Sequence, residues 1–207
     1  TVLAPQAVLL HSDTCYFGVR FLPGYNPVLG SSEIMSQLVN HQIPLDELIQ
    51  DRRMLEEICG TTDFRKQIRA FMRSYMNIYR RACPMEHSNL LVLHSFNLLI
   101  RSAGSISIEQ LAEDTGYTAR YIDRCFRNET GLSPKQLAKI VRFQAAVSAL
   151  NQNQHKGRSL TEIAADLGYF DQSHFVHDFK AYTGLTPKKY QKLLLHDSFE
   201  EKLRIVQ

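Results

Sequence analysis

The C-terminal half of the chain carries apolar residues at helical spacing, interrupted by glycine at two equivalent places. Ile108 and Leu111 predict the buried face of one helix, and Gly116 is the residue type that commonly ends a helix. Ile122 and Phe126 lie four residues apart and predict the buried face of the next helix. The pattern therefore predicts a helix, a tight turn and a second helix.

The same pattern occurs again 52 or 53 residues further along the chain. The matching pairs are Leu111 with Ile163, Gly116 with Gly168, Phe126 with Phe179, and Ser133-Pro134 with Thr186-Pro187. Each copy also begins with residues typical of a capping box, 107–110 in the first and 159–162 in the second. Two copies are too few for a solenoid, so the sequence predicts two tandem helix-turn-helix units.

A long helix is expected between the two units. Ser133 is a typical N-cap and Pro134 suits the first helical position, and we expect this helix to run to about Leu150. At 1.5 Å per residue its length is roughly 25 Å. Helix-turn-helix proteins place their second helix in the major groove, and successive grooves on one side of the duplex lie about 34 to 36 Å apart. The predicted spacer therefore suits two units that bind adjacent major grooves.

A dense run of motif residues lies in the second copy. It reads Ile163-Ala164-x-Asp166-x-Gly168-Tyr169-x-Asp171-Gln172-Ser173-His174-Phe175-x-x-x-Phe179-Lys180, followed by Gly184 and Pro187. This run resembles the DNA-binding domain of the AraC/XylS family of bacterial transcription regulators, and the resemblance covers about 105–195. It implies a mainly α fold in which two helix-turn-helix units, joined by a long linker helix, bind adjacent major grooves of double-stranded DNA.

The resemblance also assigns DNA-contacting positions to the second helix of each unit. In the first recognition helix, over 119–128, they are Arg120, Asp123, Arg124 and Arg127. In the second, over 172–182, they are Gln172, Ser173, His177 and Lys180. Arg120 and Arg124 are expected to contact base edges, whereas Arg127 and Lys180 are expected to contact phosphates. Two positions depart from the family pattern, because Asp123 is acidic and His177 stands where the family usually has arginine.

Asp123 has three interpretations at this stage. Its carboxylate holds a neighbouring arginine in place for DNA, or accepts a hydrogen bond from a cytosine amino group, or forms a simple surface ion pair with no role in DNA binding. Such a surface ion pair contributes at most about 1 kcal/mol to stability.

The N-terminal half has a less regular pattern. Partial alternation from Val8 to Phe21 predicts one or two β-strands, and a small helical region follows, with helices expected over 31–39, 45–58, 63–81 and 88–102. The segments Phe17-Gly18-Val19-Arg20-Phe21-x-Pro23-Gly24 and Pro44-Leu45-Asp46-Glu47-Leu48 resemble the end of the sensor region in one subgroup of the same family. We therefore expect a sensor or oligomerisation region over 1–104 and the DNA-binding domain over 105–207. Only the last strands of a sensor are recognised, so the chain is expected to be N-terminally trimmed or to have an unusually short sensor.

The helix expected over 63–81 is strongly amphipathic. Its apolar stripe contains Phe64, Ile68, Phe71, Met72, Tyr75, Ile78 and Tyr79. A stripe of this kind packs either in the core of its own domain or against a partner. A homodimer formed through the N-terminal helices is therefore one hypothesis for this region.

Composition and charge narrow the class of protein without deciding its function. The 207 residues are 44% hydrophobic and 22% charged, which excludes collagen-like, low-complexity and disordered chains. The longest apolar run, Leu90 to Ile100, is about half the length of a membrane span, so no membrane partner is expected. The net charge is +3, with +1 on 1–105 and +2 on 106–207, which is too weak to indicate nucleic-acid binding without a motif.

No catalytic or metal-binding constellation is evident. The four cysteines, Cys15, Cys59, Cys83 and Cys125, are isolated, and the clustered zinc-binding cysteines of DNA-repair methyltransferases with a similar DNA-binding domain are missing. Cys125 lies beside Phe126 and is expected in the core. His174 and His177 share a helix face but have no evident third ligand. We expect neither an enzyme nor a resident cofactor or metal.

The sequence thus favours a sequence-specific DNA-binding transcription regulator. The alternative is a ligand-binding or protein-interaction module whose helix-turn-helix pair no longer binds DNA. RNA polymerase is a candidate partner, a small-molecule effector is left unspecified, and a cytoplasmic, nucleoid-associated location is expected.

Overall fold

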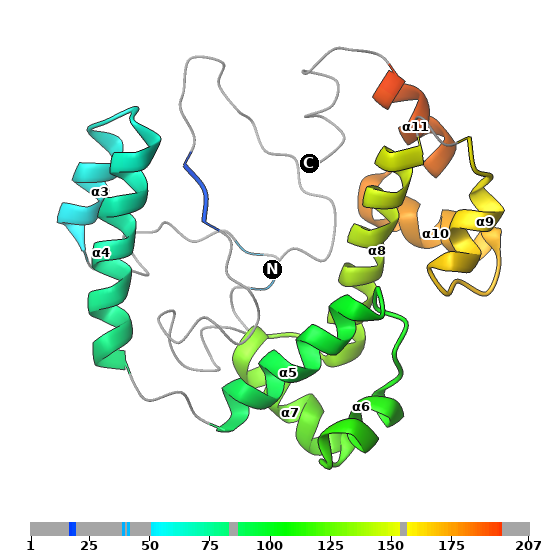
Figure 1. Cartoon of the computed structure of the whole chain (residues 1–207), viewed down its shortest axis with the longest axis horizontal. Helices are drawn as coiled ribbons and strands as arrows, with labels where there is room; N and C mark the ends of the chain where they lie inside the picture. The colour runs from blue at the N-terminus through cyan, green and yellow to red at the C-terminus, as the bar shows by residue number, and fades with distance from the viewer. Residues whose placement is uncertain are drawn as a thin grey trace. The chain divides into compact units, whose positions relative to one another are not determined.

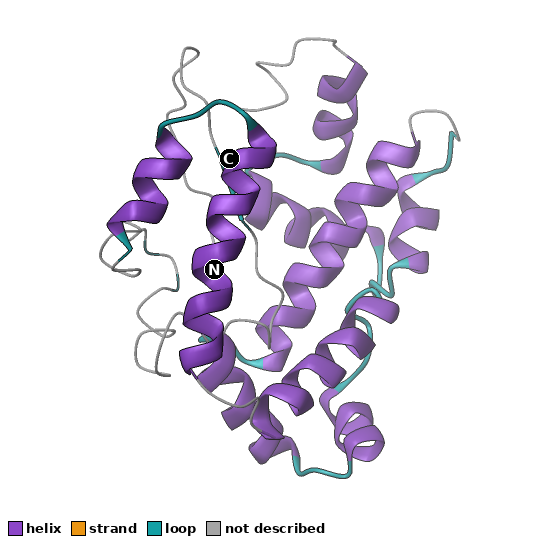
Figure 2. Cartoon of the chain, turned by 60° about the vertical axis from the view of Figure 1, so that its left-hand side comes forward, coloured by secondary structure: helices purple, strands orange, loops and turns teal. Residues whose placement is uncertain are grey.

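The structure is a computed structural model that describes residues 17–19, 39, 41, 51–82, 87–153 and 157–195. This part of the chain is mainly helical and contains no strand (Figures 1 and 2). The helices are α3 (Arg52–Cys59), α4 (Phe64–Ala82), α5 (His87–Arg101), α6 (Ile108–Thr115), α7 (Ala119–Thr130), α8 (Pro134–Gln152), α9 (Leu160–Asp166), α10 (Gln172–Thr183) and α11 (Pro187–Leu195). The helix expected over 31–39 lies almost wholly outside the described residues. So do the strands expected over 8–21, of which only 17–19 are described and lack regular structure.

The described residues form two compact units. One contains 51–94 and 120–132, and the other contains 95–119 and 133–195. The domain boundary expected at residue 104 remains a prediction.

In the first compact unit, α3 and α4 pack against each other. Asp51 is the N-cap of α3, because its side chain accepts a hydrogen bond from the Met54 backbone N–H. The helix expected over 45–58 is therefore interrupted at Asp51, and α3 begins at Arg52, while 45–50 lie outside the described residues. The small core of this pair is formed by Met54, Ile58, Ala70 and Phe71.

The structure divides the apolar stripe of α4 into two parts. Phe71 is buried, and Tyr75, Ile78 and Tyr79 are half-buried. Three other members of the stripe, Phe64, Ile68 and Met72, are exposed. One side of the stripe therefore serves the core of α3 and α4, and the other side is available at the surface.

Asp51 also links α3 to α4. The buried Ser74 hydroxyl donates a hydrogen bond to its carboxylate, and this bond, followed by the one from Met54, holds the pKa of Asp51 below its ordinary value. A carboxyl group with a depressed pKa stabilises the fold at a pH above its unfolded value, and this contribution is lost as the pH falls through the folded value.

We therefore expect Ser74→Ala to destabilise the α3–α4 pair by about 1 kcal/mol at neutral pH. The variant should also lose less stability between pH 5 and pH 3 than the unaltered chain, as measured by urea unfolding. Ser95→Ala is the matched control, because the buried Ser95 hydroxyl has no hydrogen-bond partner among the described residues. An equally steep acid dependence in the Ser74 variant would contradict the role given to this bond.

In the second compact unit, α8, α9, α10 and α11 surround one core. Its fully buried aromatic residues are Phe175 and Phe179, which correspond in the repeat to Ile122 and Phe126 of the first copy. Leu150 from α8 and Ile163 from α9 join them, and Tyr190 from α11 covers Phe179 with a ring-to-ring distance of 5.4 Å. This core fixes the orientation of α10 and hence of its outward face.

The segment after α5 lies against α8 in the same unit. Gly104 is buried, has a φ angle of +76°, and donates its backbone N–H to the Leu99 carbonyl at 2.7 Å. Its own carbonyl accepts a 2.6 Å hydrogen bond from the Arg142 guanidinium of α8. The Arg142 guanidinium also lies 5.4 Å from the centre of the Tyr169 ring, so one side chain connects this segment to the turn before α10.

Candidate nucleic-acid interface

The local structure before each predicted recognition helix follows the sequence pattern closely. Ser107 and Ser159 form the predicted capping boxes with Gln110 and Glu162 at the start of α6 and α9. Gly116 and Gly168 have φ angles of +72° and +70°, which glycine adopts without the steric cost of a side chain. Both turns therefore contain a left-handed glycine, but α6 is capped by Gly116 itself, whereas α9 is capped by Leu167 and Gly168 follows it.

Helix α7 has a buried face and a charged face. Ile122 and Phe126 are fully buried and Cys125 is nearly so, as the sequence predicts. Burial raises the pKa of the Cys125 thiol, which disfavours the nucleophilic thiolate. Of the predicted DNA-contacting side chains, Arg120, Arg124 and Arg127 are exposed, and Asp123 is partly exposed.

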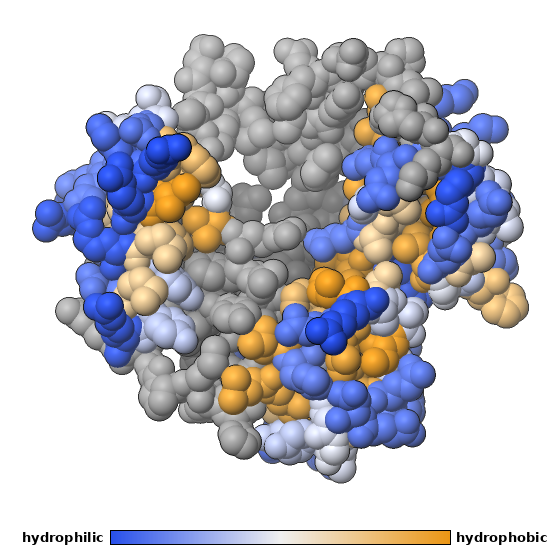
Figure 3. Space-filling view, in the orientation of Figure 1, coloured by the Kyte–Doolittle hydropathy of each residue, from blue (hydrophilic) through white to orange (hydrophobic). Residues whose placement is uncertain are grey.

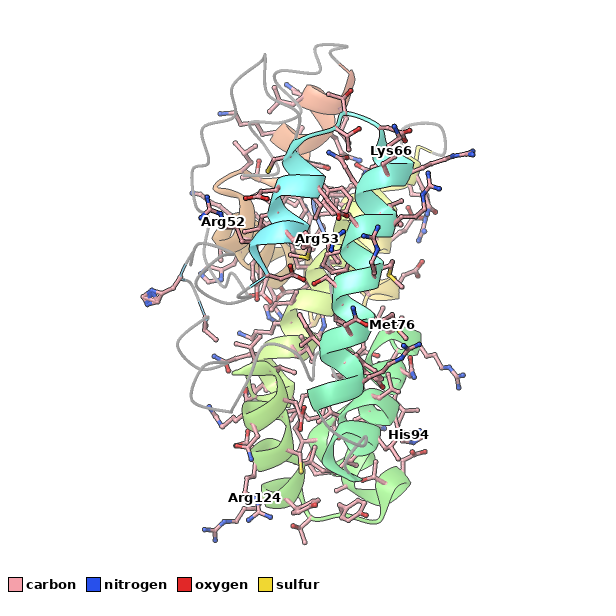
Figure 4. All side chains as sticks on the ribbon, turned by 90° about the vertical axis from the view of Figure 1, so that its left-hand side faces the viewer. Arg52, Arg53, Lys66, Met76, His94 and Arg124 are labelled. Carbon is pink, nitrogen blue, oxygen red and sulfur yellow. The ribbon has the colours of Figure 1, made fainter. Side chains whose placement is uncertain are left out.

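Two of the arginines on α7 have partners within the helix. The Arg127 Nε lies 2.7 Å from the Asp123 Oδ2, so the carboxylate holds the arginine one turn further on. The Arg124 guanidinium lies 5.0 Å from the centre of the Tyr121 ring. Figure 4 shows the Arg124 side chain extending away from the helix ribbon. Arg124 thus presents its N–H donors outward from an aromatic support, whereas Arg127 is already paired.

Helix α10 presents the second predicted set. Asp171 caps it by accepting a 2.7 Å hydrogen bond from the His174 backbone N–H. All four predicted side chains, Gln172, Ser173, His177 and Lys180, are exposed. The side of α10 opposite Phe175 and Phe179 is thus polar and accessible.

The structure adds contacts on α10 that the sequence did not indicate. The Thr161 hydroxyl of α9 donates a 2.8 Å hydrogen bond to the Gln172 side-chain oxygen. His177 is 85% exposed at its side chain, with Nδ1 3.9 Å from the mostly buried carboxylate of Asp178. Asp178 also lies 3.6 Å from the Nε2 of His174. The helical spacing of these histidines is visible in the sequence, but the burial of the carboxylate between them depends on the packing of α10.

The described residues contain neither a metal-binding cluster nor a membrane-spanning helix. No group of three or more His, Cys, Asp or Glu side chains among them is arranged to hold a metal ion. None of the helices described is both long and apolar enough to cross a membrane.

Comparison with known proteins decides the family. The profile of a family described as a helix-turn-helix domain matches residues 84–193, which include α5 to α10 and most of α11. The chain belongs to the AraC/XylS family of helix-turn-helix regulators. No solved structure matches the chain significantly.

Several bacterial transcription regulators are similar to this chain. An uncharacterized HTH-type transcriptional regulator of Haemophilus influenzae is 38% identical over 85 residues, which cover 41% of this chain and 28% of that protein. The HTH-type transcriptional activator AarP of Providencia stuartii is 29% identical over 104 residues, covering 50% of this chain and 72% of AarP. The probable transcription factor PqrA of Proteus vulgaris is 29% identical, with 42% of this chain and 69% of PqrA covered. The match spans little more than a quarter of the Haemophilus protein.

Proposed function

We propose that this chain is a sequence-specific DNA-binding transcription regulator, with 105–207 as the DNA-binding domain. The observation that carries the proposal is the duplicated unit, in which a capping box, a helix and a glycine turn precede a helix with a buried apolar face and an exposed polar one. Membership of the AraC/XylS family supports the same conclusion and a role without enzymatic activity.

In this proposal α7 and α10 are the recognition helices. Arg120, Arg124, Gln172, Ser173 and His177 would contact base edges, while Arg127 and Lys180 would bind phosphates. Helix α8, with 19 residues, would be the connecting rod, and its length is about 28 Å. This length agrees in scale with the distance of about 34 to 36 Å between successive major grooves on one side of DNA.

Salt-dependent binding tests the proposal directly. Each neutralised phosphate releases counterions, so a DNA-binding chain loses affinity for a random duplex steeply as salt is raised. A site selected from a random library should in addition bind much more tightly than the random duplex at the same salt. Absence of both effects would favour the alternative, a ligand-binding or protein-interaction module whose helix-turn-helix pair no longer binds DNA.

A second proposal concerns self-association through α4. An apolar ridge at four-residue spacing is formed by Phe64, Ile68, Met72 and Met76, with exposed fractions of 62%, 38%, 46% and 37%. The helix carries six basic residues and no acidic one, and hydrophilic side chains cover the outer edge of α3 and α4 (Figure 3). Arg65 and Arg69 flank the ridge, so two copies that pair along it would bring like charges together.

The expected result is a homodimer that becomes stronger as salt screens this repulsion. Replacing Met72 and Met76 together by Gln should shift the chain to a folded monomer, because both side chains are exposed in the single copy. The measurement is sedimentation velocity at several salt concentrations, with Lys66→Gln as a control on the same helix but away from the ridge. A double variant that associates as strongly as the unaltered chain would exclude the ridge as the interface.

The remaining parts of the proposal concern partners and location. As a transcription regulator the chain would act in the cytoplasm on nucleoid DNA, with RNA polymerase as a candidate partner. Residues 1–104 would serve as a sensor or oligomerisation region, and an effector remains to be found by binding screens on this region.

A further inference from the structure

Phe170 is the most exposed large apolar side chain in the described part of the chain. It lies in the turn between α9 and α10 and is 93% exposed, whereas Phe64, the next most exposed, is at 62%. A fully exposed phenyl ring gives up the free energy that its burial would supply. The ring is a single apolar side chain rather than part of a broad patch, so its contact would be small and local.

The backbone on both sides of Phe170 is held in place. Before it, the Tyr169 side chain is buried and its backbone N–H donates a 3.0 Å hydrogen bond to the Ala164 carbonyl. Burial raises the pKa of the Tyr169 hydroxyl to about 12, so this side chain stays neutral in its packed position. After it, Asp171 caps α10 through the His174 backbone N–H. Phe170 is therefore an outward ring on a fixed backbone.

The position of Phe170 places it beside the proposed base-reading residues of α10. It stands immediately before the N-cap Asp171, and Gln172 and Ser173 follow at the first helical positions. The N-terminal end of a recognition helix is the part that reaches base edges. In the first helix-turn-helix unit the residue two positions before α7 is Tyr117, which is 39% exposed, so a fully exposed phenyl ring is particular to the second helix-turn-helix unit.

The chemistry of the surroundings indicates the kind of contact. A protein partner would require a larger apolar surface, but the neighbouring exposed side chains are polar, namely Asp171, Gln172, Ser173 and Thr161. In the major groove the C5 methyl group of thymine is the apolar feature of the base edges, and phenylalanine is one of the side chains that contacts it. A single ring at the start of the helix matches a single methyl group in size.

We propose that Phe170 reads the C5 methyl group of one thymine in the half of the site bound by α10. This inference rests on the proposed function and deepens it, because it adds a specificity-determining residue outside the recognition helix itself. The ring excludes water from the methyl group, and the adjacent Gln172 supplies the polar contact to the same or the next base pair.

The experiment removes the methyl group without changing base pairing. A binding site is first selected with the unaltered chain, and each thymine in it is then replaced by deoxyuridine, which lacks only the C5 methyl. At one thymine in the α10 half of the site we expect an affinity loss of about fourfold, the value for one buried methyl group. Phe170→Ala should bind the unmodified site about fourfold more weakly and should no longer distinguish thymine from deoxyuridine at that position.

Matched variants make the result specific. Phe170→Leu should keep part of the preference for thymine, and Leu90→Ala, which removes an exposed apolar side chain from the other compact unit, should leave it unchanged. If the unaltered chain selects a site but is insensitive to every deoxyuridine, or if Phe170→Ala keeps the full sensitivity, the inference is overturned while the proposed function stands. If no site is selected at all, the proposed function fails and the inference fails with it.

Discussion

Gly104→Ala should destabilise the second compact unit, which contains α8 to α11, by about 3 kcal/mol or more. The substitution adds both a strained backbone and a steric conflict. A Cβ atom at this position would lie 2.2 Å from the carbonyl oxygen of Ala138 and 2.9 Å from the backbone nitrogen of Arg142. Both are backbone atoms of α8, so no side-chain rotation can relieve the contact. The φ angle of +76° adds the usual cost of a left-handed conformation for alanine, about 1 to 2 kcal/mol.

Gly116→Ala provides the matched control for this prediction. Its φ angle is +72°, but nothing lies within 4 Å of the Cβ position. The expected loss of stability is therefore only the cost of a left-handed backbone for alanine, about 1 to 2 kcal/mol. Urea unfolding of the two variants separates strain from steric conflict. Equal losses would mean that the segment after α5 moves away from α8 at little cost, and the close packing of Gly104 would then have no energetic role.

Arg124→Ala should relax sequence preference at one or two base pairs in the half of the site bound by α7. A bidentate arginine–guanine contact supplies about 1 to 3 kcal/mol of discrimination, or roughly 5- to 150-fold in relative affinity. The ring of Tyr121 beneath the guanidinium holds it outward, so little ordering is needed on binding. Arg124→Lys should lose most of the preference as well, because an ammonium group cannot make the bidentate contact.

Arg127→Ala and Lys180→Ala are the contrasting variants. Both should weaken specific and random DNA alike and reduce the slope of log affinity against log salt by about one. For Arg127 the ion pair with Asp123 competes with phosphate, so Asp123→Asn should change affinity more than sequence preference. Binding-site selection with each variant checks the assignment. An Arg124→Ala chain that enriches the original motif unchanged would show that another residue of α7 reads the bases.

Much of the fold from α6 to α11 could be predicted because its signals are local. A capping box, a left-handed glycine and a proline at the first helical position each act over three or four residues, and the structure has them at Ser107, Gly116 and Pro134. The buried positions of Phe175 and Phe179 also follow from helical periodicity alone. The helix expected over 45–58 is interrupted at Asp51, which fits a helical pattern by spacing but caps α3 through Met54 and accepts a second hydrogen bond from Ser74 of α4.

For the candidate site the sequence supplies a list of residues, and their assignment to DNA contacts remains a prediction. Helical spacing indicates that Asp123 can reach an arginine, yet it does not say which one, and the structure selects Arg127. The hydrogen bond from Thr161 to Gln172 joins two helices across a turn, so no periodicity within either helix indicates it.

The sequence by itself determined the duplicated helix, turn and helix pattern, the outward polar faces of α7 and α10, and the family to which the chain belongs, since these depend on spacing within short segments. Tertiary structure alone decided which side of the α4 stripe is core, how closely Gly104 approaches α8, and that Phe170 is left in solvent while its neighbour Tyr169 is buried. The physical reason is that burial and close approach depend on which distant segments meet. A phenylalanine next to a glycine turn has the same local sequence whether its ring faces a core or a ligand.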